Sequence, residues 1–226
     1  MNDQQQETRV GASPAGPPQY RRVTGAATAA KTLILLTTVG AVLDAVSDWR
    51  TYFAVHDYLA GAATDGDLDA ADSFSRAVAL PALVAYLAAT VVFLVWLWRA
   101  RINSESSGGP GSHRHKRGMV VYGWMTPVAN LWIPYRVVSD IWRASAPRRN
   151  TPRGLVTTWW VLFTADTALS PALVRLYESK PTEPTLRTTA DLSTVSAVLE
   201  VIAGLLIIVI IARVTRWQTA TPPAAE

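Results

Sequence analysis

The sequence predicts an all-α integral membrane protein with four transmembrane helices and a proline-broken helical segment that is either re-entrant or interfacial. Two observations carry this prediction. The apolar residues, which make up 50% of the 226-residue chain, are gathered into blocks about as long as a bilayer is thick. The cations are spread unevenly over the segments that join these blocks.

The first predicted helix covers about residues 23–47, with an uncharged centre and Lys31 near its entrance. A lysine there can lay its aliphatic stem along apolar surface while its ammonium stays in water. Arg21 and Arg22 before an apolar run also fit a secretory signal peptide, but the stretch VLDAVSDW that follows has no small-x-small cleavage site. We therefore expect a retained transmembrane helix.

The other predicted helices cover about residues 76–98, 154–175 and 192–213. The first of these three has an uncharged run from 77 to 98, and the other two carry one acid each, Asp166 and Glu200. Roughly 20 helical residues cross a hydrocarbon core of about 30 Å. Helices buried in a soluble domain are the alternative, but these usually keep a polar stripe, which residues 77–98 lack.

The cation distribution predicts how the chain is threaded. Of the 21 Lys and Arg residues, 16 lie in the two terminal segments and in the stretch between the second and third helices, and five lie in the other two loops. Because cytoplasmic loops are enriched in Lys and Arg, we expect a multi-pass protein of the cell membrane with both termini in the cytoplasm.

The segment 119–146 is apolar enough to resemble a fifth helix. A single crossing there would place the following arginines outside and invert the rest of the chain. Pro127 and Pro134 also interrupt helical hydrogen bonding. We therefore expect a segment that starts and ends on the cytoplasmic side, either as a re-entrant hairpin or as short helices at the interface.

The two ends of the chain are predicted to be disordered tails. Residues 1–22 are rich in Gln, Pro and Gly, and residues 217–226 are largely small and polar. The sequence between them, 23–216, is predicted to form a single membrane domain.

Residues 123–142 read GWMTPVANLWIPYRVVSDIW and resemble the signature of the bacterial, mostly actinobacterial, membrane proteins grouped as domain of unknown function 4328. The stretch WLWRARIN, with Trp96, Arg99 and Asn103, also resembles this family, and the resemblance covers about residues 25–216. It implies a multi-pass membrane protein with no established activity. The signature positions are Gly123, Trp124, Pro127, Asn130, Leu131, Pro134, Tyr135 and Trp142.

Asp166 and Glu200 are the strongest candidates for a functional site. Each lies 12 residues from the predicted cytoplasmic end of its helix, so we expect both at a similar depth, about 18 Å into the membrane. Carboxylates at such depth are costly and mark functional sites by default. The functional interpretation is a cation or proton site between the third and fourth helices. The structural alternative is a hydrogen bond between helices, made through Thr164, Thr167, Ser170 or Ser196.

Weaker candidates have ordinary structural explanations. Asn130, between the two prolines, either faces a ligand or satisfies backbone groups. Asp44 and Asp48, one turn apart, are expected to pair with Arg76. His113 and His115 are expected in a solvated basic loop, since two histidines without a third ligand make a poor metal site.

These features favour an accessory or interaction protein of the membrane, and the alternative is a small transporter or channel-like protein using the two carboxylates. We expect no enzyme, because hydrolase, zinc-protease and nucleotide-binding motifs are absent from the sequence. No catalytic residue, metal site or cofactor is therefore predicted. The predicted partners are the lipid bilayer, anionic headgroups at the basic loops, and a protein partner or second copy, but not nucleic acid.

Overall fold

The computed structural model describes residues 20–108, 113–126, 129–147 and 151–220, and these residues are all-α, without a strand. Most of both predicted tails, Pro127 of the motif and part of each basic loop lie outside the described residues. The elements are α1 (Thr24–Leu59), α2 (Asp65–Gly108), α3 (Met119–Met125), the 3-10 helix η1 (Ala129–Leu131), α4 (Ile133–Ser145), α5 (Gly154–Tyr177) and α6 (Glu183–Ala220).

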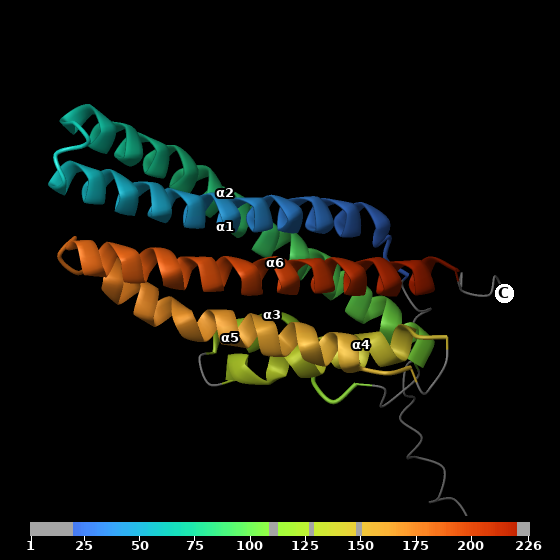
Figure 1. Ribbon diagram of the computed structural model, residues 1–226. Helices are drawn as coiled ribbons and strands as arrows, with labels where there is room; N and C mark the ends of the chain where they lie inside the picture. The colour runs from blue at the N-terminus through green and yellow to red at the C-terminus, as the bar shows by residue number, and fades with distance from the viewer. Residues whose placement is uncertain (1–19, 109–112, 127–128, 148–150, 221–226) are drawn as a thin grey trace, which may run out of the picture.

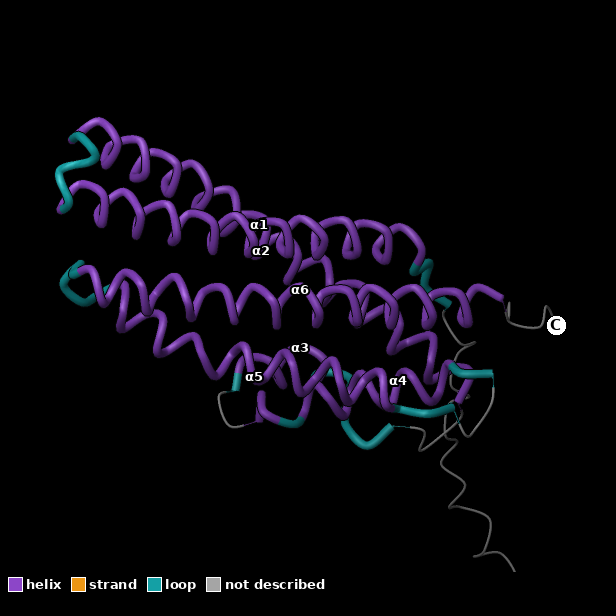
Figure 2. Tube along the Cα trace, in the orientation of Figure 1, coloured by secondary structure: helices purple, strands orange, loops and turns teal. Residues whose placement is uncertain are grey.

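The four long helices form two antiparallel hairpins that pack side by side (Figure 1). Helix α1 packs on α2 and on α6, and α6 packs on α5. The short turns that close the two hairpins lie at the same end of the bundle (Figure 2). The described chain ends and the α3–α4 segment lie toward the opposite end (Figure 1), which is the relative arrangement that the cation distribution predicts.

Three of the long helices, α1, α2 and α6, are long and apolar enough to cross a membrane. The exposed side of α2 is markedly apolar: Leu80 is 66% exposed and Val91 is 62% exposed. Contiguous apolar surface of this kind fits contact with lipid. The fourth predicted span, α5, is not among them, because Asp166, Pro171 and several threonines interrupt its apolar stretch.

The long helices extend well beyond the predicted spans. Helix α1 has 36 residues, α2 has 44 and α6 has 38. Residues 217–220, which the sequence places in a disordered tail, continue α6. Hydropathy predicted the apolar centre of each helix, whereas the polar ends remain helical because backbone hydrogen bonding does not stop at the membrane boundary.

The described part of the motif segment folds as α3, η1 and α4 rather than as one helix. Pro134, however, lies in the first turn of α4, where its missing N–H has no helical partner to lose, and it starts this helix rather than breaking it. Gly123 allows α3 to approach α4 closely. A Cβ at this position would lie 2.5 Å from Cγ2 of Ile133, which is too close for any side chain.

Polar contacts tie the helix ends together near the chain termini. Asn103 accepts a hydrogen bond from the backbone N–H of Arg21 and donates to the carbonyl of the same residue, both at 2.8 Å. Gln218 donates to the carbonyl of Ala100 and to Ser145 Oγ. Trp96 donates to Thr215 Oγ1 at 3.1 Å. The motif positions Trp96 and Asn103 therefore join α2 to α6 and to the chain before α1.

Candidate cation site between the long helices

Asp166 of α5 and Glu200 of α6 line the same cavity, which has a volume of about 400 Å³. All four long helices contribute to its wall, and α3 contributes one residue. The lining comprises Ile34, Thr37, Thr38, Tyr86, Ala89, Thr90, Phe93, Trp124, Trp159, Phe163, Asp166, Thr167, Ser170, Ser196, Glu200, Ala203, Gly204 and Ile207.

The two carboxylates differ in their hydrogen bonding. Ser196 Oγ donates to Asp166 Oδ1 at 2.5 Å, so the bond between α5 and α6 that the sequence offered as an alternative is present. Glu200 lies one turn further along α6, on the same face as Ser196. No hydrogen bond to Glu200 occurs among the residues that the structure describes. The charges of Asp166 and Asp44 both act on it. Glu200 is therefore the carboxylate left open to a ligand.

The other hydroxyls suggested as bridges do not join the helices. Thr164 donates to backbone carbonyls of its own helix, at Trp160 and Val161. Thr167 donates to the carbonyl of Phe163. Each of these hydroxyls uses its hydrogen within its own helix, but its oxygen lone pairs can still accept a hydrogen bond from another group.

Aromatic side chains from three helices form one part of the cavity wall. Trp124 meets Phe93 edge to face at a centroid distance of 5.8 Å, and meets Phe163 in the same geometry at 5.9 Å. Its indole nitrogen is buried and has no partner in the described part of the chain. Among the motif residues that the structure describes, Trp124 alone lines the cavity.

The other described motif residues serve the packing of the α3–α4 segment. Trp142 is 1% exposed, and Gly123 is buried against Ile133. Tyr135 shares a hydrogen bond with Thr157 across to α5. The carbonyl of Leu131 accepts a hydrogen bond from Trp160. These hydrogen bonds fix the segment onto α5, and α4 also packs on α6.

Asn130 lies away from the two carboxylates. Its backbone N–H donates to the carbonyl of Thr126, and its side-chain Oδ1 is buried without a partner in the described chain. It does not line the cavity. The structure therefore does not bring Asn130 together with Asp166 and Glu200.

The expected pairing of Asp44 and Asp48 with Arg76 is wrong. No ion pair joins these residues in the described structure. Instead, Tyr177 at the end of α5 donates to Asp48 Oδ2 at 2.8 Å. The carboxylate of Asp48 on α1 therefore faces α5 rather than α2. Residue spacing along α1 alone could not show this.

The loop around His113 is packed rather than simply solvated. Arg114 donates to Asp140 from its backbone N–H and from its guanidinium, and Arg143 also donates to this carboxylate. Burial raises the pKa of Asp140, but these hydrogen bonds outweigh it and hold that pKa below its ordinary value. A hydrogen bond joins His113 Nε2 to Ser104 Oγ at 3.1 Å. The described residues contain no group of three potential metal ligands.

Acidification is expected to destabilise the protein through His113. Burial, together with the charge of Arg101, lowers the pKa of this imidazole to about 4. Between pH 6.5, the ordinary pKa of histidine, and about pH 4, His113 is protonated in the unfolded chain but not in the folded chain. The free energy of unfolding therefore falls as the pH falls through this window. Thermal unfolding at several pH values should show a shallower decline for His113→Gln than for the wild type.

Ser104→Ala is the matched control for this experiment. It removes the hydrogen bond to His113 but keeps the titrating group, so its melting curve should be displaced with the pH slope retained. Identical pH slopes for the wild type and His113→Gln would contradict the assignment of this proton uptake to His113.

Sequence reasoning missed most of the cavity wall. Trp159, Phe163, Asp166 and Ser170 recur at spacings of four, three and four, as do Ser196, Glu200, Ala203 and Ile207. Such spacing places each set on a single helix face. This signal was available in the sequence, but which faces meet depends on how the helices pack.

Comparison with known proteins gives a family but no activity. No curated protein and no solved structure matches the chain. The family model described as "Domain of unknown function (DUF4328)" matches residues 59–216, so the match begins at the end of α1 rather than near residue 25. Because this match covers well over half of the chain, the protein belongs to the DUF4328 family.

Proposed function

We propose that this chain is a small transporter- or channel-like protein of the cell membrane that binds a cation at Asp166 and Glu200. The supporting observation is that two carboxylates from different helices line one cavity, and that one of them has no hydrogen-bond partner in the described chain. Two acids in a poorly solvated site repel each other and favour a bound cation. The proposal includes no catalytic step.

The proposal treats α5 as a fourth span. This helix has 24 residues, so it is about 36 Å long, enough to cross a hydrocarbon core. It runs antiparallel to α6 and packs along it (Figure 1). Its polar side chains Asp166 and Ser170 line the cavity, so they need not face lipid in a helix that crosses the bilayer.

We also propose that the motif segment is re-entrant, with both of its ends and both chain termini in the cytoplasm. Trp124 supports this, because it lies in the same cavity wall as Phe163, nine residues into α5. A short segment lying only on the bilayer surface would not bring a side chain to that depth.

The threading can be tested with single cysteines, since the chain has none of its own. Gly66→Cys, at the exposed start of α2, should react with a membrane-impermeant maleimide added to intact cells. Ser106→Cys, exposed near the other end of α2, should react only after the cells are opened. The reverse labelling pattern would invert the proposed orientation.

An accessory role through a protein partner is a second candidate. Four apolar side chains of the motif region point outward: Tyr122, Met125, Leu131 and Trp132 are between 43% and 74% exposed. A protein partner, a second copy of the chain or the lipid headgroup region would cover such a surface. This role stays a prediction.

The transport proposal is tested in proteoliposomes on a solid-supported membrane. Rapid addition of sodium, potassium, protons or benzyltrimethylammonium should produce a charge-movement current with at least one of these probes. Glu200→Gln and Asp166→Asn should reduce that current by about tenfold or more, because each removes a charge from the cavity.

Glu178→Gln is the matched control, since Glu178 is an exposed acid just beyond α5 and does not line the cavity. It should keep the full current. Wild-type protein that is folded but silent toward every probe, or a current that survives both cavity substitutions, would overturn the proposal.

A further inference from the structure

We infer that the cation bound between α5 and α6 is organic, an ammonium ion that carries an aromatic or bulky apolar group. This inference deepens the proposed function and rests on it. It is based on the size of the cavity, on the separation of polar and aromatic surface within it, and on the absence of an oxygen cage among the described residues.

The cavity is too large for a bare metal ion. Its volume of about 400 Å³ falls within the range of roughly 300–1,000 Å³ that small-molecule sites occupy. A calcium ion needs about six to eight oxygen ligands at short distance. In the described chain no group of three acidic or histidine side chains is close enough to begin such a shell.

The charged part of the cavity lies toward the hairpin turns. Helix α5 runs toward its turn, so Asp166 and Ser170 lie nearer to that end than Phe163 does. Helix α6 runs away from its turn, so Ser196 and Glu200 lie nearer to that end than Ile207 does. Both carboxylates therefore occupy the same half of the cavity.

Most of the aromatic lining lies toward the chain termini, whereas Tyr86 of α2 lies nearer to the hairpin turns than Phe93 does. Phe163 lies one helical turn from Asp166 on the same face of α5, and Trp159 lies one turn further toward the chain termini. Phe93 comes from α2 and Trp124 from α3, and Trp124 holds Phe93 and Phe163 in edge-to-face contact. Aromatic faces attract a cation within about 6 Å and also accept apolar groups.

A ligand that matches this arrangement has a cationic head at Glu200 and an apolar body among the aromatic rings. An inorganic cation would use the carboxylates and leave the aromatic half unfilled. A neutral apolar ligand would fill the aromatic half and leave two acids uncompensated, which is costly in a site of low polarity. An organic ammonium ion satisfies both halves.

The test measures binding of tritiated benzyltrimethylammonium to the full-length protein in nanodiscs. Neopentylbenzene is its uncharged isostere, because a carbon replaces the nitrogen, and tetramethylammonium keeps the charge but lacks the ring. Both competitors should displace the probe about tenfold less effectively than unlabelled benzyltrimethylammonium, and sodium should not displace it.

Two substitutions test separately whether the carboxylate half and the aromatic half of the cavity contribute to binding. Glu200→Gln should weaken binding by about tenfold or more, and Trp124→Leu by roughly fivefold, since leucine keeps an apolar surface without an aromatic face. Tyr122→Leu is the matched control, because this exposed aromatic residue of α3 does not line the cavity, and it should bind as the wild type does. Retained melting temperatures would show that the variants fold.

The outcomes separate this inference from the proposed function. Glu200-dependent currents with sodium or protons, without binding of benzyltrimethylammonium, would overturn the organic cation and leave the transport proposal standing. Equal competition by neopentylbenzene, or unchanged binding in Trp124→Leu, would also overturn the inference. Failure of every probe to bind or move charge in a Glu200-dependent way would overturn both.

Discussion

Replacing Trp142 by alanine is expected to lower the free energy of unfolding by about 3–5 kcal/mol, the range for deleting a fully buried indole. Trp142 is 1% exposed, and its ring meets that of Trp217 edge to face at a centroid distance of 4.7 Å. Its indole N–H donates to the carbonyl of Pro152 at 3.2 Å. The substitution therefore removes an aromatic contact between α4 and the end of α6 and a hydrogen bond to the chain entering α5. Thermal or denaturant unfolding of the detergent-solubilised full chain measures the effect.

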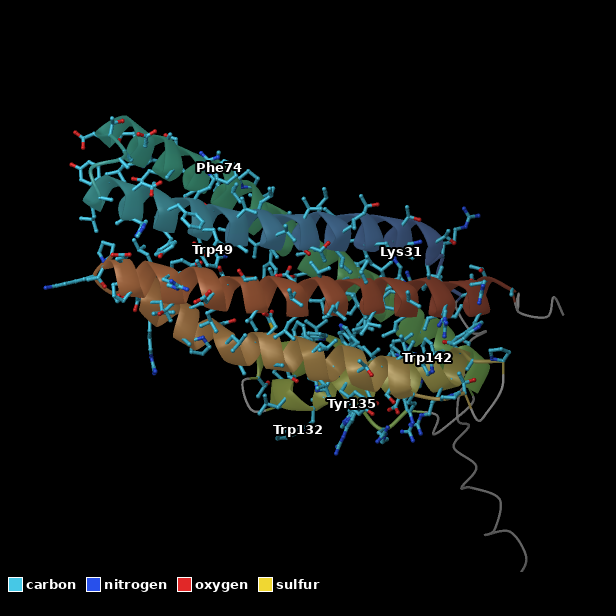
Figure 3. All side chains as sticks on the ribbon, in the orientation of Figure 1. Lys31, Trp49, Phe74, Trp132, Tyr135 and Trp142 are labelled. Carbon is cyan, nitrogen blue, oxygen red and sulfur yellow. The ribbon has the colours of Figure 1, made fainter. Side chains whose placement is uncertain are left out.

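Trp132→Ala is the natural comparison, because Trp132 belongs to the same segment, labelled in Figure 3, but is 43% exposed. Its truncation should change the free energy of unfolding by less than about 1 kcal/mol. If both variants lost stability equally, Trp142 would not be the anchor of the segment. If Trp132→Ala instead removed capture of a defined protein partner while the fold was retained, the accessory role would gain support.

The helical organisation was largely predictable from the sequence because hydropathy acts locally. The uncharged run in 77–98 and the apolar run near the end of α6 are each sufficient to predict a long helix at that place. The ends were less predictable. Residues 65–75 are polar and acid-rich, yet they form the first turns of α2, where Asp65 and Asp67 lie favourably near the positive end of the helix dipole.

The partners of the polar residues could not be predicted, because they depend on how each helix is rotated. Charge matching paired Asp48 with Arg76, but Asp48 accepts a hydrogen bond from Tyr177, 129 residues further along the chain. The depth of Asp166 and Glu200 followed from counting residues, whereas their shared cavity required knowing which faces of α5 and α6 meet. Ser196 was one of four hydroxyls proposed as bridges, and only the packed structure selects it.

Most of the motif at residues 123–142 serves helix packing rather than the lining of the cavity. Gly123 and Trp142 serve the close packing of α3 and α4 on each other and on the long helices. Its first tryptophan, Trp124, has a different place, in the wall of the cavity. The same short sequence therefore supplies a scaffold and one candidate ligand contact, and its spacing alone does not distinguish the two.

Placing an alanine at Gly204 is expected to destabilise the protein by about 1–3 kcal/mol, although alanine is the better helix former by about 1 kcal/mol. A Cβ at this position would collide with Cγ2 of Thr38 and would lie 3.6 Å from Cγ2 of Ile34. Thr38 cannot rotate away without loss, because its hydroxyl donates to the carbonyl of Leu35 at 2.8 Å. The collision would push α1 from α6 at the edge of the cavity, and unfolding of Gly204→Ala measures its cost.

Removal of the obstructing methyl group shows whether the collision is the cause. In a Thr38→Ser background the hydroxyl remains and Cγ2 is absent, so Gly204→Ala should become neutral or stabilising, with an interaction free energy of about 1–3 kcal/mol between the two sites. Gly25→Ala is the control in open space, since a Cβ there meets no atom within 4 Å, and it should stabilise α1 slightly. If Gly204→Ala were equally destabilising with serine at position 38, close contact between α1 and α6 would not be the reason for this glycine. Rescue by serine would instead establish that the two helices approach each other at the wall of the cavity, where the proposed ligand must fit.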